Sequence, residues 1–170
     1  DHAMTEITTL PPDMHDGAAG SRLLTAPVQQ IVAPLWLGAE RRGPDLGAGV
    51  IAHDLRSRWD RRRDLAQLQR LLPDITLALH EPVAIERELG QRRLGFLNEI
   101  RSACEEIATA TAAAIEQDQL AVVLGGDHAI AAGSLAGASR ASERLGVLWL
   151  DAHPDLNTPR TSPSGHIHGM

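Results

Sequence analysis

Short apolar runs alternate along this chain with longer segments in which apolar residues recur every three or four positions. The continuous runs at 120–124 and 145–150 are typical of buried strands, and a third run, interrupted by Pro34, covers 28–37. Helical spacing is found at 44–59, 60–72, 89–117 and 129–140. Residues 75–79 and 82–85 are further short strand candidates, between which the pattern does not decide.

The alternation of strands and helices predicts an α/β fold, with a parallel sheet and helices on both of its faces. The longest helix, at 89–117, presents an apolar stripe that includes Ile100, Cys104 and Ile107 and should connect two parallel strands. Residues 1–27 are rich in proline and glycine, and we interpret them as an irregular leader. One interpretation of residues 1–3 is a cloning remnant ahead of a natural start at Met4.

Polar residues follow two of the predicted strands. The run at 120–124 leads into Gly125, Gly126, Asp127 and His128, in which the glycines permit a tight turn. The run at 145–150 leads into Asp151, His153 and Asp155 at alternate positions, which an extended backbone sends to one side. In parallel strands both groups would lie at the carboxyl edge of the sheet, where open α/β sheets bind ligands.

Two carboxylates and imidazoles gathered at a sheet edge are suited to binding a metal. Oxygen and nitrogen ligands without thiolates favour manganese, zinc or iron over copper(I) or an iron–sulfur cluster. The histidine pair His166 and His168 could bind zinc by itself, but no Asp-His follows it as in metallo-β-lactamase patterns. The sequence therefore predicts a metal site built from His128, Asp151, His153 and Asp155.

These motifs together resemble the arginase family of ureohydrolases. The resemblance is carried by GGDH at 125–128, WLDAHPDLNTP at 149–159 and SGHIHGM at 164–170. The tryptophan before the aspartate, the Asn-Thr-Pro run and the Ser-Gly before His168 are the arginase form rather than that of the related agmatinases. The motifs cover roughly the last third of the chain, and their combination is far more specific than any one of them.

The resemblance implies two manganese ions and an arginase-like three-layer α/β/α fold. It assigns His128 to one ion and His153 to the other, gives Asp151 a bridging role, and makes Asp155 a ligand on the His128 side. Arginase-like proteins use a metal-bridging hydroxide on the guanidinium carbon of L-arginine, which yields L-ornithine and urea. A carboxylate can bridge two ions because it has two oxygens.

The resemblance also implies roles around the metals. His168 matches the family's proton-shuttling histidine. An imidazole suits this task because its unperturbed pKa is close to neutrality. Asn157, Ser162 and Ser164 fall where the family recognises the amino-acid end of its substrate. His166 stands where the family has an asparagine that contributes to substrate contacts, which bears on selectivity for arginine.

Three further positions lie beside the predicted ligands. Ala129 follows GGDH where serine is usual, and Pro154 lies between two predicted ligands where threonine or alanine is usual. Neither change removes a ligand. Asp127 is expected to orient a neighbouring ligand rather than to bind metal.

The family's second aspartate pair, an Asp-x-Asp on a later strand, has no counterpart before Met170. We therefore expect residues 28–170 to be the N-terminal part of an arginase-like domain, as a truncated form. The 170-residue chain alone is then expected to be inactive or very weak, with an active enzyme as its parent. The alternatives are another ureohydrolase, such as an agmatinase or guanidino-acid hydrolase, and an inactive arginase-like fragment that acts as a subunit or binding partner.

Composition narrows the remaining classes. A formal net charge of -6 and 2% aromatic residues argue against a nucleic-acid partner. No run reaches the roughly 20 apolar residues of a membrane span, and no signal peptide is evident. Cys104 is the single cysteine, which fits a cytoplasmic protein without disulfides. The resemblance further implies a homo-oligomer, as a trimer or hexamer.

Overall fold

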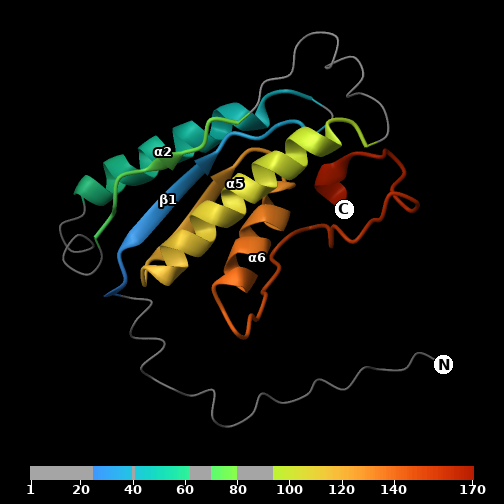
Figure 1. Cartoon of the computed structure of the whole chain (residues 1–170). Helices are drawn as coiled ribbons and strands as arrows, with labels where there is room; N and C mark the ends of the chain where they lie inside the picture. Colours follow the sequence, from blue (N-terminus) through green and yellow to red (C-terminus); the bar gives the residue numbers. More distant parts are fainter. Residues whose placement is uncertain (1–24, 40, 62–69, 80–93) are drawn as a thin grey trace.

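The computed structural model describes residues 25–39, 41–61, 70–79 and 94–170. Within these ranges the chain forms β1 (Val28–Ala33), α2 (Pro44–Arg61), β2 (Ile75–Thr76), α5 (Leu97–Glu116), β3 (Leu120–Gly125), α6 (Ile130–Arg140) and the short 3₁₀ helix η2 (Ile167–Gly169) (Figure 1). The strands form one sheet in the order β2-β1-β3, and both pairings are parallel. The predicted parallel α/β architecture is therefore confirmed.

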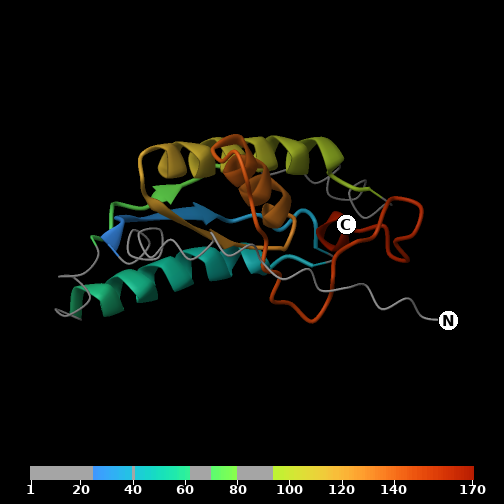
Figure 2. The ribbon, with the colours of Figure 1, turned by 90° about the horizontal axis from the view of Figure 1, so that it is seen from below.

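Helices cover both faces of this sheet. Helix α2 lies on one face, and α5 and α6 lie together on the other, so that three layers are visible in the turned view (Figure 2). The central strand β1 is buried at all six positions, even at Gln29 and Gln30. One apolar cluster, with Val32, Ala48 and Ala52, joins β1 to α2. A parallel strand that is covered on both faces is expected to be mostly apolar.

The first strand is shorter than the predicted 28–37, because β1 ends at Ala33, just before Pro34. Proline has no backbone N–H to donate to a neighbouring strand. Beyond it, Leu35 and Leu37 turn into a second apolar cluster with Ile100 and Ala103 of α5. The proline thus separates a strand that pairs within the sheet from a loop that packs under a helix.

Helices α5 and α6 pack closely because α6 presents two glycines to α5. A Cβ atom at Gly133 would lie 2.8 Å from the carbonyl oxygen of Cys104, and one at Gly137 would lie 2.4 Å from that of Ala108. The predicted stripe is buried at Ile100 and Ile107. Helix α5 begins at Leu97 rather than near residue 89, after a turn in which Phe96 adopts a φ of 57°.

The predicted strand at 145–150 is the main correction. These residues form no strand, and no described strand pairs with them. Their side chains are exposed, with Leu148 at 83% and Leu150 at 87%. A strand requires a neighbour that satisfies its backbone groups and covers its apolar side chains, and an apolar run does not supply that neighbour.

The predicted helix at 60–72 is wrong at its described C-terminal end, and its first two residues belong to the preceding helix. Helix α2 continues through Asp60 to Arg61, and Leu71 forms an isolated parallel bridge to Val28. Residues 62–69 lie outside the described part of the chain, as do the strand candidate at 82–85 and residues 1–24 of the predicted leader. The candidate at 75–79 is confirmed in part as β2, and the helix predicted at 129–140 is confirmed as α6.

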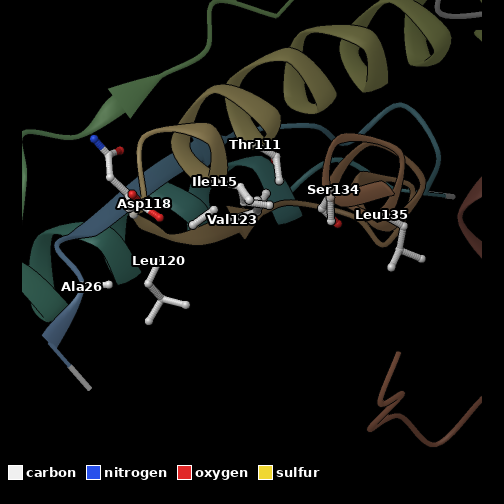
Figure 3. A pocket seen from close by; sticks show the side chains of 11 residues that line it. Ala26, Thr111, Ile115, Asp118, Leu120, Val123, Ser134 and Leu135 are labelled. Carbon is white, nitrogen blue, oxygen red and sulfur yellow. The ribbon is translucent and has the colours of Figure 1, made fainter. Parts of the chain in front are cut away.

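A groove of about 610 Å³ runs beside β3, where α5 and α6 face the sheet (Figure 3). Its lining is largely apolar and includes Ile115, Leu120, Val123 and Leu135. The hydroxyl oxygen of Thr111, which lines this groove, is buried and has no hydrogen-bond partner among the described residues. The groove contains none of the predicted metal ligands, so it is separate from the polar site.

Candidate metal centre

The turn after β3 brings His128 to the carboxyl edge of the sheet. Gly126 makes this turn possible, because a Cβ atom there would lie 1.7 Å from the carbonyl oxygen of Leu35. The N–H of Asp127 donates to the same oxygen at 2.8 Å. The double-glycine turn is thereby held against the segment that follows β1, and His128 projects from it.

Asp127 lies inside the turn and is 5% exposed. Its carboxylate accepts hydrogen bonds from the N–H of Gly38 at 2.8 Å and of Ala129 at 2.9 Å. Asp127 does not belong to the group of convergent ligand atoms described next. The expectation that Asp127 orients a neighbouring ligand stays a prediction.

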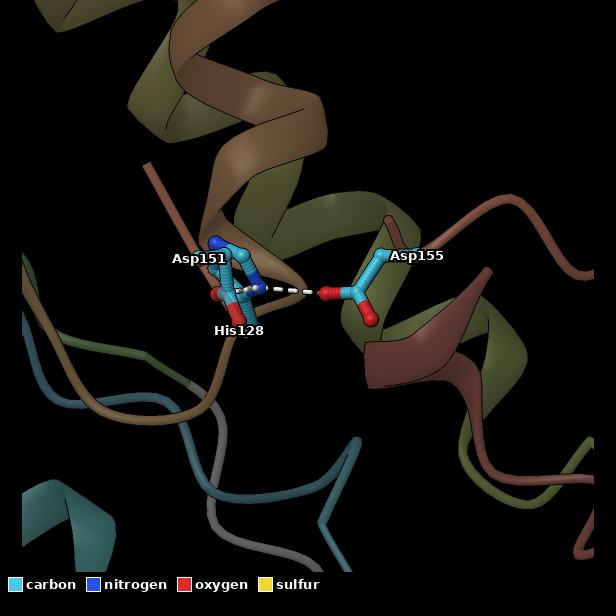
Figure 4. A group of neighbouring side chains, drawn as sticks. All are labelled: His128, Asp151 and Asp155. Carbon is cyan, nitrogen blue, oxygen red and sulfur yellow. Dashed lines mark hydrogen bonds and ion pairs between the residues drawn. The ribbon is translucent and has the colours of Figure 1, made fainter. Parts of the chain in front are cut away.

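Three of the four predicted ligands converge. One ligand atom from each of His128, Asp151 and Asp155 lies within 4.8 Å of the others (Figure 4). Nδ1 of His128 is in close contact with Oδ2 of Asp155 and lies 3.5 Å from Oδ2 of Asp151. A nitrogen and two carboxylates that point at one another form a donor set suited to a divalent cation such as manganese.

His153 lies beside this group but is directed outwards. Its side chain is 81% exposed, and its Nδ1 lies 3.6 Å from Oδ1 of Asp151. The period of two fails here because the backbone does not stay extended: Pro154 intervenes, and Asp155 has a φ of 45°. This left-handed conformation, which aspartate tolerates better than most residues, belongs to the turn that brings Asp155 to His128.

The carboxylate of Asp151 is stabilised in its charged form. The backbone N–H of His153 donates to its Oδ1 at 2.9 Å. This hydrogen bond, assisted by the nearby imidazoles of His128 and His153, lowers the pKa of Asp151. The residue therefore stays ionised, as a metal ligand must be.

His168 reaches the site from the opposite side, on η2. Its Nδ1 is in short hydrogen-bond contact with the carbonyl oxygen of Gly38, and its backbone N–H donates to the same oxygen at 3.4 Å. The ring of His166 stacks on that of His168, with 5.9 Å between centroids. The structure thus brings both histidines of the predicted pair to the loop that follows β1.

The predicted substrate-binding residues are engaged mainly in local turns. The hydroxyl oxygen of Ser162, which is 5% exposed, accepts from the N–H of Gly165, and that of Ser164 accepts from the N–H of His166. Asn157 accepts a hydrogen bond from Thr161 and donates its backbone N–H to Gly169. Of these three residues, Asn157 alone lines the cleft that contains the convergent ligands, whereas the two serines bond within the loop.

Two hollows meet at the ligand group. A polar cleft of about 470 Å³ contains the three convergent ligands, with His153, Asn157 and His168 on its wall. A more apolar pocket of about 500 Å³ shares His128, Asp155 and His168 and continues towards Cys104 and Trp149. The ligand atoms are therefore accessible, and a small polar molecule can reach them beside His168.

Two contributors to the site were missed from the sequence. Gly38 supplies the carbonyl that holds His168, and a Cβ atom there would lie 2.8 Å from Oδ1 of Asp127. Trp149, identified from the sequence only as part of a family motif, is 37% exposed. Its ring lies 5.0 Å from that of His128, and its indole N–H donates to the carbonyl of His153. For Gly38, the only signal available in the sequence was that this position is a glycine.

A parallel α/β sheet with convergent nitrogen and oxygen ligands at its carboxyl edge defines a candidate metal-dependent protein of the three-layer class. Comparison with known proteins gives the family: residues 26–170 match the model of the arginase family. The chain belongs to the arginase family.

The similar proteins are arginases of bacteria and a protist. The arginase of Bacillus caldovelox is 42% identical over 150 residues, and that of Bacillus subtilis is 40% identical over 145 residues. These matches cover 85% and 84% of this chain and 46% of each relative, so the chain spans about half the length of the curated relatives it matches.

Solved structures of arginases are also similar to this chain. The native B. caldovelox arginase has a TM-score of 0.68 at 41% identity, covering 85% of this chain and 47% of its own. The Entamoeba histolytica arginase in complex with L-ornithine has a TM-score of 0.66 at 31% identity, covering 84% and 47% respectively. Among the described residues no helix combines the length and apolar character needed to cross a bilayer.

Proposed function

We propose that the full-length protein that contains this chain is a manganese-dependent arginase that hydrolyses the guanidinium group of L-arginine to L-ornithine and urea. The observation that carries the proposal is the convergence of His128, Asp151 and Asp155 at the end of β3, in a chain of the arginase family. The crystallised complex of the E. histolytica relative with L-ornithine supports the choice of substrate.

The residues present fit manganese. His128 offers a nitrogen, and Asp151 and Asp155 offer oxygens, within 4.8 Å of one another and open to the polar cleft. We assign His153 to the second ion, for which its exposed imidazole has to turn towards Asp151. When bound, the metals supply a Lewis acid and lower the pKa of water enough for attack on carbon at neutral pH.

The chain's own residues bind the substrate and move protons. We assign proton transfer to His168: its Nδ1 is engaged by Gly38, which leaves Nε2 free to carry the proton. Asn157, Ser162 and Ser164 form the loop that receives the amino-acid end of the substrate. His166 stacks on His168 and is placed to contact the same end.

Two further properties stay predictions. Assembly into a trimer or hexamer is tested by light scattering after size-exclusion chromatography of the metal-loaded protein. Cytoplasmic location is tested by fractionation of the cells that express it. Each is independent of the assay for the reaction.

The proposal is tested by urea release from L-arginine by the full-length protein, before and after chelation and after manganese is returned. We expect turnover with manganese, loss with chelator and recovery on addition of the metal. Agmatine and guanidino acids serve as alternative substrates, because agmatine lacks the α-carboxylate of arginine and guanidino acids lack its α-amino group, and the proposed loop should recognise both groups. Turnover of these compounds but not of arginine would favour another ureohydrolase.

A variant separates metal chemistry from protein stability. Asp151→Asn keeps the size of the side chain but removes the carboxylate, so bound manganese and urea release should fall together. Asp54→Asn, on the exposed surface of α2 where Asp54 pairs with Arg58, should change neither. Urea release that survives Asp151→Asn at full rate would contradict a metal role for this residue.

A further inference from the structure

Asp127 is a buried carboxylate that the proposed reaction does not use. It connects two segments that lie far apart in the sequence, since one oxygen accepts from the N–H of Gly38 and the other from the N–H of Ala129. The two amides face different oxygens of Asp127, and an asparagine in the same place would present a donating NH2 group to one of them. Asp127 thus fixes the loop after β1 relative to the turn that bears His128.

The fit between these segments leaves no space for a side chain at position 38. A Cβ atom on Gly38 would lie 2.8 Å from Oδ1 of Asp127 and 3.2 Å from Cβ of Ala129. The glycine is therefore required by the close approach of the carboxylate, an observation independent of the hydrogen bonds. Any larger residue has to push Gly38 away from Asp127.

Gly38 in turn holds His168. Its carbonyl oxygen accepts a hydrogen bond from the backbone N–H of His168 and is also in hydrogen-bond contact with the ring Nδ1. A carbonyl oxygen only accepts, so the ring nitrogen that faces it carries the proton. This selects the tautomer with hydrogen on Nδ1 and leaves Nε2 as the unprotonated nitrogen.

We propose that Asp127 is a positioning residue that sets the orientation and tautomer of His168 through Gly38, while anchoring the turn of His128. The inference rests on the proposed function in so far as His168 transfers protons there. The same carboxylate would then keep the proton-transferring histidine in register with the metal ligand. Outer partners of this kind typically contribute about 10–100-fold to activity or metal affinity.

The tautomer can be measured directly. Solid-state nitrogen NMR of the full-length protein, labelled with ¹⁵N-histidine and loaded with zinc to avoid broadening by manganese, reports which ring nitrogen is protonated. The signal of His168 is assigned by its loss in His168→Gln. We expect the wild-type ring to carry hydrogen on Nδ1, and hydrogen on Nε2 alone would overturn the inference without any further variant.

Two variants approach the network from opposite sides. Asp127→Asn leaves one of the two amides without an acceptor, and Gly38→Ala forces the segments apart. Both should convert His168 to a mixture of tautomers in the folded protein. Asp74→Asn, which removes the partner of Arg56 at a distance from the site, is the matched control and should leave His168 unchanged even where stability falls.

Kinetics distinguish this inference from the proposed function. Both variants should lower kcat for arginine by about 10–100-fold with little change in KM, because the substrate loop is untouched. Wild-type arginine turnover with unchanged tautomer and kcat in both variants would overturn the inference and leave the proposed function standing. Absence of arginine turnover in the wild type would overturn the proposed function, whereas the NMR result would still decide the role of Asp127.

Discussion

At the scale of single residues, the backbone conformation of one aspartate decides the geometry of the candidate site. Asp155 has a φ of 45°. Its side chain is only 15% exposed, and its carboxylate contacts Nδ1 of His128. The preceding Pro154 fixes its own φ and removes an N–H donor. The turn directs Asp155 inwards and His153 outwards, although both were expected on the same side.

Asp155→Ala should therefore abolish most of the metal binding. Its carboxylate is the closest partner of His128, and loss of a ligand should exceed the about 10–100-fold effect typical of outer partners. Manganese retained after dialysis, measured by mass spectrometry, and the dissociation constant from calorimetry provide the test. Asp54→Ala is the control, and equal metal retention in the two variants would exclude Asp155 as a ligand.

At the scale of elements, the contact between α5 and α6 depends on residues without side chains. Gly133 and Gly137 allow the backbones of the two helices to approach, and Ile107 fills the space beside Gly133. The sulfur of Cys104 donates to the carbonyl of Ala129 at the same contact. Burial raises the pKa of this thiol, so it stays protonated and packs as an apolar group.

Substitutions of glycine by alanine should have opposite signs in different helices. Gly137→Ala places a Cβ atom 2.4 Å from the carbonyl of Ala108, and overpacking of this kind costs about 1–3 kcal/mol. Gly47→Ala in α2 meets nothing within 4 Å and should stabilise by about 0.5–1 kcal/mol through helix propensity. Urea denaturation gives both values, and destabilisation by both variants would show that α2 is not in the described environment.

At the scale of the whole molecule, the structure leaves an apolar segment in contact with solvent. Leu148 and Leu150 are exposed, and β3 has a single strand neighbour among the described residues. An exposed apolar run together with an unpaired strand edge favours association between chains.

The 170-residue chain should accordingly associate with itself as its concentration rises. Leu148→Lys should shift the chain towards monomer, because a buried ammonium group opposes an apolar contact. Leu46→Lys, on α2 where Leu46 is 72% exposed, adds the same charge outside residues 145–150 and should have little effect. Sedimentation velocity over a concentration series tests this, and a monomer at every concentration would contradict it.

Much of the architecture was determined by the sequence itself. The apolar runs of β1 and β3, the glycine turn before His128 and the helical spacing of α5 and α6 are local features, and each predicted its element, although the end of β1 before Pro34 was not predicted. They succeed because periodicity, proline and glycine act on the backbone within a few residues. The ligand types at 128, 151 and 155 likewise predicted the composition of the site.

Only the tertiary structure decided how distant segments meet. It placed Gly38 between Asp127 and His168, turned His153 away from the ligands, and left 145–150 unpaired with any strand that the structure describes. The sequence pattern records which side chains are apolar or polar, but not which backbone lies opposite them. A hydrogen bond between residues 38 and 168 depends on the packing of the whole sheet and its helices, and no local spacing contains that information.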